Sequence, residues 1–219
     1  MAAAVADLIL VNINPAYQSE ELSYTIDKVG LSVLFLNDKF RHLDYIKIVK
    51  SIIPEIEHRN PYDIKSNRFP TLKGVVRMNN TNDHIKGFVN YTDIPEPANR
   101  SLFPDKIDPD HPANIQFTSG TTGRPKAATL SHYNILNNAY LIGEKCRYTE
   151  KDNIAVAVPF YHCFGMIMGT LGAFTRGAGI TVVTEGFDPK KTLEAVTKYK
   201  CTSLYGVPTM FIEYLKHYE

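Results

Sequence analysis

Cysteine is scarce in this sequence, and its arrangement suits neither of the usual structural roles. The three cysteines, Cys146, Cys163 and Cys201, are far apart and form no CxxC pair. An odd number at such spacing argues against a disulfide framework and against a zinc cluster. We therefore expect three reduced thiols.

Net charge is almost absent as well. The 24 Lys and Arg residues against 23 Asp and Glu residues give a formal charge of +1. A broad basic surface for nucleic acid or for an anionic membrane is therefore not expected, and any bound anion must be held locally. No feature of the sequence predicts a specific protein partner.

Long hydrophobic runs are missing. A membrane-spanning helix needs about 18 successive apolar residues, and no stretch of the chain reaches that length. The opening MAAAVADLILV has no basic segment ahead of its short apolar run. We predict neither a signal peptide nor a transmembrane segment.

The apolar pattern instead predicts alternating strands and helices. The 219 residues are 44% hydrophobic, which is enough to bury a sizeable core. Leu8 to Val11 is expected to form a buried strand, followed by a helix that opens at Ser19 and ends at Gly30. Leu31 to Leu36 is a second apolar strand. A longer helix is predicted by the helical spacing of Leu43, Ile46, Val49, Ile52, Ile53 and Ile56.

A change of composition divides the chain. Residues 78–114 are dense in Asn, Asp and Pro and have little periodic apolar content. Such a stretch predicts a polar surface connection. We therefore expect βα units over residues 1–77, the connection over 78–114, and a second part of the same domain over 115–219.

The second part repeats the alternation. Helices are predicted after Ser131, after Phe164, after the Asp188-Pro189 pair and from Pro208. Strands are predicted at Ile115–Thr118, Ala127–Leu130, Ile154–Val158, Ile180–Val183 and Thr202–Tyr205. The predicted fold class is α/β, with layered, mostly parallel sheets and helices.

The loop after the first of these strands, TSGTTGRPK, gathers small donors beside a cation. Its glycines let backbone amides approach an anion, and its hydroxyl groups add further donors. Lys126 can reach phosphate oxygens, and Arg124 is a second candidate because nothing in the sequence fixes where its side chain points. The order is neither the Walker GxxxxGK[ST] nor GxGxxG. On composition alone, a flexible turn remains the alternative.

Four segments of the sequence carry a family resemblance. TSGTTGRPKAATLSH closely resembles the phosphate-binding signature of the adenylate-forming enzymes, [ST]SG[ST]TGxPKG followed by a Ser/Thr-His pair. VPFYHCFG and YGVPTMF resemble two further blocks of that superfamily, and LILVNINPAYQSEELSYTIDKVG resembles its upstream NPAY…EL element. The likeness covers essentially the whole chain and is closest to the medium-chain fatty acyl-CoA synthetases.

One residue departs from the signature. Ala127 stands where a glycine usually follows the lysine. If that backbone needs a positive φ or a close phosphate contact, Ala127 would weaken nucleotide binding.

The resemblance implies part of the large N-terminal domain of an enzyme that uses a fatty acid, ATP and CoA, with Mg²⁺. In such enzymes the carboxylate attacks the α-phosphate of ATP, and the CoA thiol then displaces AMP. Catalysis there is mainly positioning and charge stabilisation. Lys126 and His162 match the catalytic positions, and Thr121 and Thr122 match the metal-binding ones. The residues that match ATP-binding positions are Thr118, Ser119, Gly120, Thr121, Thr122, Gly123 and Lys126. Those that match acid-binding positions are His162, Tyr205, Gly206, Val207 and Pro208.

Several alternatives remain open at this point. Other blocks of the family and its C-terminal domain are not found in the sequence, so we expect a fragment that does not turn over alone. A non-catalytic nucleotide- or acyl-binding module is the alternative. His162 could be a packed structural histidine, and Met166 and Met168 could be plain core. The resemblance points to mitochondria, with the cytoplasm as the alternative compartment.

Overall fold

The chain forms two compact units in the computed structural model, which describes residues 1–78, 83–96, 104–118 and 123–217. Unit 1 comprises Met1–Asn12, Pro104–Thr118 and Ala128–Glu219. Unit 2 comprises Ile13–Phe103 and Ser119–Ala127. The signature that follows Phe117 therefore contributes residues to both units.

Unit 2 is built on a parallel sheet in the order β2-β5-β6. Strand β2 (Val33–Leu36) pairs with β5 (Gly74–Arg77), and β5 pairs with β6 (Val89–Asn90), both in parallel. The remaining elements are α2 (Ser19–Val29), the antiparallel hairpin of β3 (Lys39–Phe40) and β4 (Leu43–Asp44), α3 (Tyr45–Ile52), and the short 3₁₀ turns η1 (Ile56–His58) and η2 (Tyr91–Asp93).

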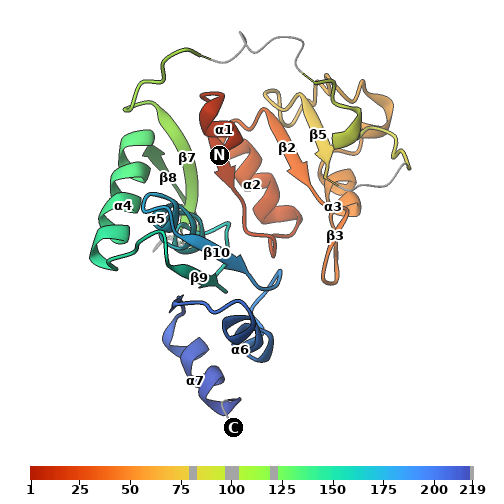
Figure 1. Ribbon diagram of the computed structural model, residues 1–219. Helices are drawn as coiled ribbons and strands as arrows, with labels where there is room; N and C mark the ends of the chain where they lie inside the picture. The colour runs from red at the N-terminus through yellow and green to blue at the C-terminus, as the bar shows by residue number, and fades with distance from the viewer. Residues whose placement is uncertain (79–82, 97–103, 119–122, 218–219) are drawn as a thin grey trace. The chain divides into compact units, whose positions relative to one another are not determined.

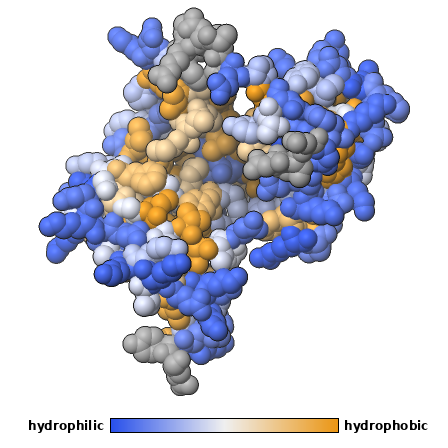
Figure 2. Space-filling view, turned by 45° about the vertical axis from the view of Figure 1, so that its right-hand side comes forward, coloured by the Kyte–Doolittle hydropathy of each residue, from blue (hydrophilic) through white to orange (hydrophobic). Residues whose placement is uncertain are grey.

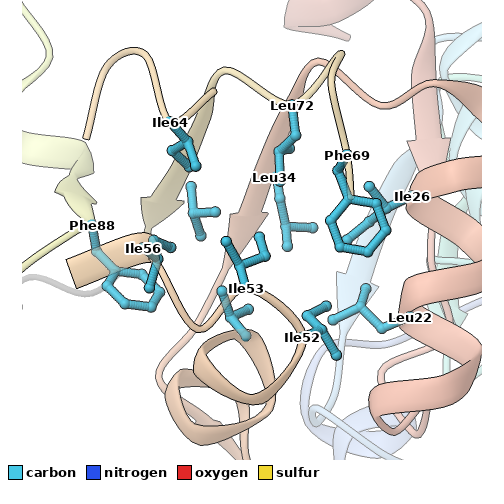
Figure 3. Close-up of a cluster of buried hydrophobic side chains, with 12 residues drawn as sticks. Leu22, Ile26, Leu34, Ile52, Ile53, Ile56, Ile64, Phe69, Leu72 and Phe88 are labelled. Atoms are coloured by element: carbon cyan, nitrogen blue, oxygen red, sulfur yellow. The ribbon is translucent and has the colours of Figure 1, made fainter. Parts of the chain in front are cut away.

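An apolar cluster of described residues forms the core of unit 2 (Figure 3). Leu22 of α2 lies beside Ile52 at the end of α3, and Ile26 lies beside Phe69. Leu34 of β2 belongs to the same cluster. These side chains are between 0 and 6% exposed. Burying a large aliphatic side chain contributes about 1.5–3 kcal/mol, so this cluster dominates the stability of the unit.

The second helix of unit 2 is shorter than its apolar pattern predicts, which corrects the expectation of a helix from Leu43 to Ile56. Asp44 caps α3, and its Oδ1 accepts from the Lys47 amide at 3.1 Å, so the helix begins at Tyr45. Pro54 disfavours helical backbone in the residue before it, and α3 ends at Ile52. The apolar residues with helical spacing therefore share one core, but they do not all belong to one helix.

The polar stretch 78–114 supplies part of this core. Phe88 and Val89 are 6 and 5% exposed, and β6 extends the sheet. Arg77, fully buried at the end of β5, donates to both Asp38 carboxylate oxygens at 2.8 and 2.6 Å and to Asn90 Oδ1 at 2.9 Å. A buried charge needs such partners, so the guanidinium ties β6 to the strands beside it.

Unit 1 contains two three-stranded sheets. The first has the order β1-β7-β8, from β1 (Leu10–Asn12), β7 (Pro112–Thr118) and β8 (Lys126–Ser131). The second has the order β10-β9-β11, from β9 (Asn153–Val156), β10 (Gly179–Val182) and β11 (Ser203–Leu204). The pairings of β1 with β7 and of β9 with β10 and β11 are parallel. The predicted α/β class with mostly parallel sheets is confirmed.

The helices of unit 1 are α1 (Ala2–Val5), α4 (His132–Lys145), the π-helical segment η4 (Phe164–Leu171), α5 (Gly172–Phe174), α6 (Pro189–Lys198) and α7 (Pro208–Lys216). Helix α4 packs on η4 and α5 (Figure 1). The predicted caps are confirmed: Ser131 Oγ accepts from the Asn134 amide at 3.2 Å, and Asp188 Oδ1 accepts from the Lys191 amide at 3.0 Å.

The first predicted strand is more exposed than the sequence predicted. Strand β1 is Leu10–Asn12, and Leu8, Ile9 and Leu10 are 60, 47 and 40% exposed. In the described part of the chain β1 is an edge strand beside β7, so one of its sides lacks a neighbour. Apolar residues also reach the surface elsewhere, and Figure 2 shows them gathered in patches among hydrophilic ones.

Candidate functional site

The phosphate-loop signature follows a strand that ends at Thr118. Strand β7 lies between β1 and β8 in its sheet, and Thr118 is exposed at its carboxyl end. Ligands of α/β proteins bind in this position, outside the carboxyl ends of parallel strands. Four of the predicted ATP-binding residues, Ser119, Gly120, Thr121 and Thr122, lie outside the described residues.

Gly123 adopts a backbone conformation that favours glycine. Its φ is +89°, which a side-chain-bearing residue rarely adopts, and no atom of the described residues lies within 4 Å of where a Cβ would stand. The requirement for glycine is therefore conformational rather than steric. Gly123 and Arg124 are both exposed.

Lys126 and Arg124 differ in where they point. Lys126 is exposed and is the first residue of β8. The Arg124 guanidinium lies over the Tyr24 ring, 5.4 Å from its centroid, which is within the range of a cation–π contact. Of the two cations that the sequence left open, Arg124 is held by α2, and Lys126 is the one left to extend to a ligand.

Ala127 occupies ordinary strand backbone. The side-chain-bearing residues with positive φ in the described part of the chain are Asp7, Arg41, Lys65, Arg147 and Lys200, and Ala127 is not among them. The first reason for expecting a penalty at this position is therefore removed. Close approach of a phosphate is the remaining one.

His162 is exposed and lies directly ahead of η4 in unit 1. Its Nδ1 accepts a hydrogen bond from the Phe164 amide at 3.1 Å. An accepting Nδ1 carries no proton, so the neutral imidazole has its proton on Nε2. The ring thus presents an N–H donor away from its own backbone. The expectation of a packed structural histidine does not match this exposure.

Tyr205 joins His162 through Phe164. The Phe164 and Tyr205 rings meet edge to face with centroids 5.7 Å apart, while the Phe164 amide holds His162. The Tyr205 hydroxyl accepts from the Tyr148 hydroxyl at 3.0 Å, and the Tyr148 hydroxyl lies 2.6 Å from Ser203 Oγ. The structure therefore brings two predicted acid-binding residues into one connected group.

The other predicted acid-binding residues follow Tyr205 directly. A Cβ on Gly206 would stand 3.1 Å from Phe211 Cε2, so the glycine allows α7 to pack closely. Val207 is the N-cap of α7 and is 42% exposed, and Pro208 is its first residue. These residues place the start of α7 beside Tyr205.

Sequence reasoning missed Tyr148 and Ser203. Tyr148 is 9% exposed and lies between α4 and β9, in RYTEKDN, which matches no motif. Its role depends on a contact with Tyr205, which lies 57 positions further along the chain. No local signal could have shown that contact.

Burial shapes the ionisation of these tyrosines. Desolvation raises the pKa of Tyr148 and, together with the hydrogen bond to Tyr148, raises the pKa of Tyr205 still more strongly. Desolvation likewise raises the pKa of the Cys163 thiol beside His162. Cys163 is thereby a poor thiolate nucleophile, and covalent catalysis through a Cys-His pair is not supported.

The raised tyrosine pKa values predict loss of stability in alkali. An unfolded tyrosine ionises near pH 10, whereas folded Tyr148 and Tyr205 keep their protons to higher pH. Their contribution is therefore complete below about pH 10 and declines as the pH rises toward the folded values. We expect tyrosinate absorbance of these two residues to appear together with loss of helical circular dichroism. Tyr133→Phe, an exposed control, should not alter this coincidence. Ionisation of the buried pair well before unfolding would contradict it.

The described residues contain neither a metal-ligating cluster nor a membrane span. No group of three or more His, Cys, Asp or Glu side chains there could hold a metal ion. The predicted magnesium-binding residues, Thr121 and Thr122, lie outside the described residues. No described helix is long and apolar enough to cross a membrane. All three cysteines are free thiols, as predicted.

Known proteins resemble the chain along its whole length. Medium-chain acyl-CoA ligase ACSF2, mitochondrial, of Bos taurus is 38% identical over 226 aligned positions, covering 98% of this chain and 36% of its own length. A Bacillus subtilis (strain 168) protein with acyl-CoA synthetase in its name, YngI, is also 38% identical, covering 99% of this chain and 40% of its own length. The chain thus spans about two fifths or less of these relatives.

Solved structures share the fold. MatB of Rhodopseudomonas palustris, solved with ATP bound, superposes with a TM-score of 0.69 at 22% identity, over 98% of this chain and 37% of that one. MbtA of Mycobacterium smegmatis gives 0.74 at 24% identity, over 95 and 35%. The sequence profile of the family described as AMP-binding enzyme matches residues 1–219. The chain belongs to the AMP-binding enzyme family.

Proposed function

We propose that the chain carries the phosphate-binding and part of the acid-binding machinery of a fatty acyl-CoA synthetase. The reaction converts ATP, a carboxylic acid and CoA to acyl-CoA, AMP and pyrophosphate through an acyl-adenylate. The observation that carries the proposal is the signature TSGTTGRPK at the carboxyl end of β7. Two relatives that are 38% identical and named for acyl-CoA ligation support it.

The phosphates of ATP suit the donors of the signature. Thr118 to Gly123 would hold the β- and γ-phosphates, and the open backbone at Gly123 leaves room for them. Hydroxyl oxygens of Thr121 and Thr122 are hard ligands of the kind that Mg²⁺ accepts. Magnesium would neutralise phosphate charge there. Lys126, exposed on β8, would offset charge on the departing pyrophosphate.

The carboxylic acid suits the group around His162. The Nε2–H of His162 can donate to a carboxylate, since Nδ1 is occupied by the Phe164 amide. Tyr205, Gly206, Val207 and Pro208 would line the acid on the side where α7 starts. Apolar residues at the start of η4, including Phe164, would face an alkyl chain. The CoA thiol would then attack the carbonyl of the acyl-adenylate, forming the thioester and displacing AMP.

The names of the relatives suggest a compartment and an acid chain length for this protein. The ACSF2 relatives are named medium-chain and mitochondrial, whereas YngI is bacterial. We propose a medium-chain fatty acid and a mitochondrial location, with the cytoplasm as the alternative.

Equilibrium dialysis with labelled ATP and Mg²⁺ tests the proposal, followed by carboxylate-dependent exchange of labelled pyrophosphate into ATP with acids from acetate to palmitate. Because the chain spans 36 to 40% of these relatives, we expect saturable ATP binding without exchange from these residues alone. Exchange would show that the first half-reaction is complete in them. Binding without exchange for every acid also fits a non-catalytic binding module. Absence of magnesium-dependent ATP binding would refute the proposal.

A further inference from the structure

Tyr24 of α2 contacts both residues that precede Lys126. Its hydroxyl donates to the Pro125 carbonyl oxygen at 2.9 Å, and its ring lies under the Arg124 guanidinium at 5.4 Å. The hydrogen bond joins positions 101 residues apart in the sequence, and all three residues belong to unit 2. One side chain therefore holds two successive residues of the signature.

The helix that carries Tyr24 is firmly placed. Leu22 and Ile26, two residues to either side, are 6 and 0% exposed in the core of the unit. The helix ends in a left-handed Gly30, whose amide donates to Asp27 O. The phenol of Tyr24 thus extends from a backbone that has little freedom to move.

Fixing the Pro125 carbonyl also fixes the start of Lys126. The carbonyl oxygen, the Lys126 amide and the Lys126 Cα share one peptide plane. The proline ring restricts its own φ to near −65°, so few rotations remain on the other side of that plane. The Tyr24 hydroxyl therefore sets the direction in which the chain enters β8, and with it the origin of the Lys126 side chain.

The ring of Tyr24 separates the two cations of the signature. It holds the Arg124 guanidinium against α2, while Lys126 is exposed. Without the ring, two flexible cations two residues apart would compete for one anion.

We propose that Tyr24 is a positioning residue for Lys126, acting through the Pro125 carbonyl and the stacked Arg124. The proposal rests on the proposed function only in taking the ligand of Lys126 to be a nucleotide phosphate. The alternative is a purely structural role, in which the hydroxyl only stabilises unit 2.

Unit 2 offers a matched control for that alternative. The Tyr45 hydroxyl donates to the Pro15 carbonyl oxygen, so it makes the same kind of bond in the same unit. Tyr45 is the first residue of α3, and this bond involves no residue of the signature. Tyr45→Phe removes an equivalent hydrogen bond while leaving Arg124 to Lys126 untouched.

Tryptic cleavage at Lys126 measures how well the segment is held without any ligand. Trypsin cuts after Lys126, whereas Arg124 is protected by the proline that follows it. We expect Tyr24→Phe to raise the cleavage rate after Lys126 at least about 2-fold, in keeping with the loss of one hydrogen bond, and Tyr45→Phe to leave it unchanged. Equal rates in all three proteins would overturn the proposal.

Binding of ATP with Mg²⁺ then tests the positioning itself. We expect Tyr24→Phe to raise the dissociation constant about 2- to 10-fold and Tyr24→Leu, which also frees Arg124, to raise it further. Tyr45→Phe should leave it unchanged, although it lowers thermal stability. Equal effects of Tyr24→Phe and Tyr45→Phe on ATP affinity would make the role structural. If wild type binds no ATP, the proposed function fails, and the cleavage rates alone decide whether Tyr24 holds the segment.

Discussion

Replacing Lys126 with alanine is expected to weaken the binding of ATP with Mg²⁺ about 10- to 100-fold. Lys126 is exposed at the start of β8 and follows a segment held by Tyr24, so its ammonium group can extend to phosphate. A hydrogen bond to a charged partner contributes about 1.5–3 kcal/mol, which corresponds to this range. Equilibrium dialysis with labelled ATP measures the change.

Two further variants test whether the loss of ATP affinity is specific to the Lys126 ammonium group. Lys151→Ala removes an exposed lysine outside the signature, in unit 1, and should leave ATP affinity unchanged. Lys126→Arg keeps the charge but replaces a point charge by a planar fork, so we expect it to restore only part of the affinity. If Lys126→Ala binds ATP as tightly as wild type, Lys126 is not a phosphate ligand and the assignment of the signature fails.

Local signals predicted much of the fold. Ser131, Asp188 and Gly30 each act within a few residues of their own position, as a cap or as a left-handed helix end. The alternation of apolar runs with these signals therefore predicted the order of strands and helices. Parallel pairing followed because each crossover between neighbouring strands contains enough chain for a helix.

Long-range contacts explain where the prediction was wrong. Ile53 and Ile56 continue the apolar spacing of α3 because they enter the same core, yet Pro54 lies between them and the helix has already ended. Strand β6 lies in a stretch rich in Asn and Asp because Arg77 needs polar partners there. Neither contact leaves a periodic trace in the sequence.

The candidate site likewise contains residues that a local motif predicted and residues that only long-range contacts bring in. The order of residues in the signature predicted Lys126 and Gly123, because phosphate binding needs several donors within one short segment. Tyr24 and Tyr148, which hold Pro125 and Tyr205, act over 101 and 57 residues. The contacts of Tyr24 and Tyr148 form only when the helices and strands of the folded chain pack together.

Replacing Gly165 with alanine is expected to destabilise unit 1 and to displace His162. A Cβ at this position would stand 2.4 Å from the Pro159 carbonyl oxygen, 2.7 Å from its carbon and 2.9 Å from the Val158 carbonyl oxygen. All three are backbone atoms and cannot rotate away as a side chain could. Such overpacking costs about 1–3 kcal/mol, which lowers the melting temperature of a chain this long by roughly 2 to 12 °C.

The displacement reaches His162 through the hydrogen bonds around it. The His162 amide donates to the Pro159 carbonyl oxygen, and the Gly165 amide donates to the His162 carbonyl oxygen. Moving the Pro159 carbonyl therefore moves the backbone on which the imidazole stands, and its NMR signals should shift. Gly179→Ala is the control, because a Cβ there meets Asn153 Oδ1 at an ordinary 3.5 Å. A Gly165→Ala protein with wild-type melting temperature and unchanged His162 signals would show that the turn before η4 is free to adjust, and that His162 is not fixed by it.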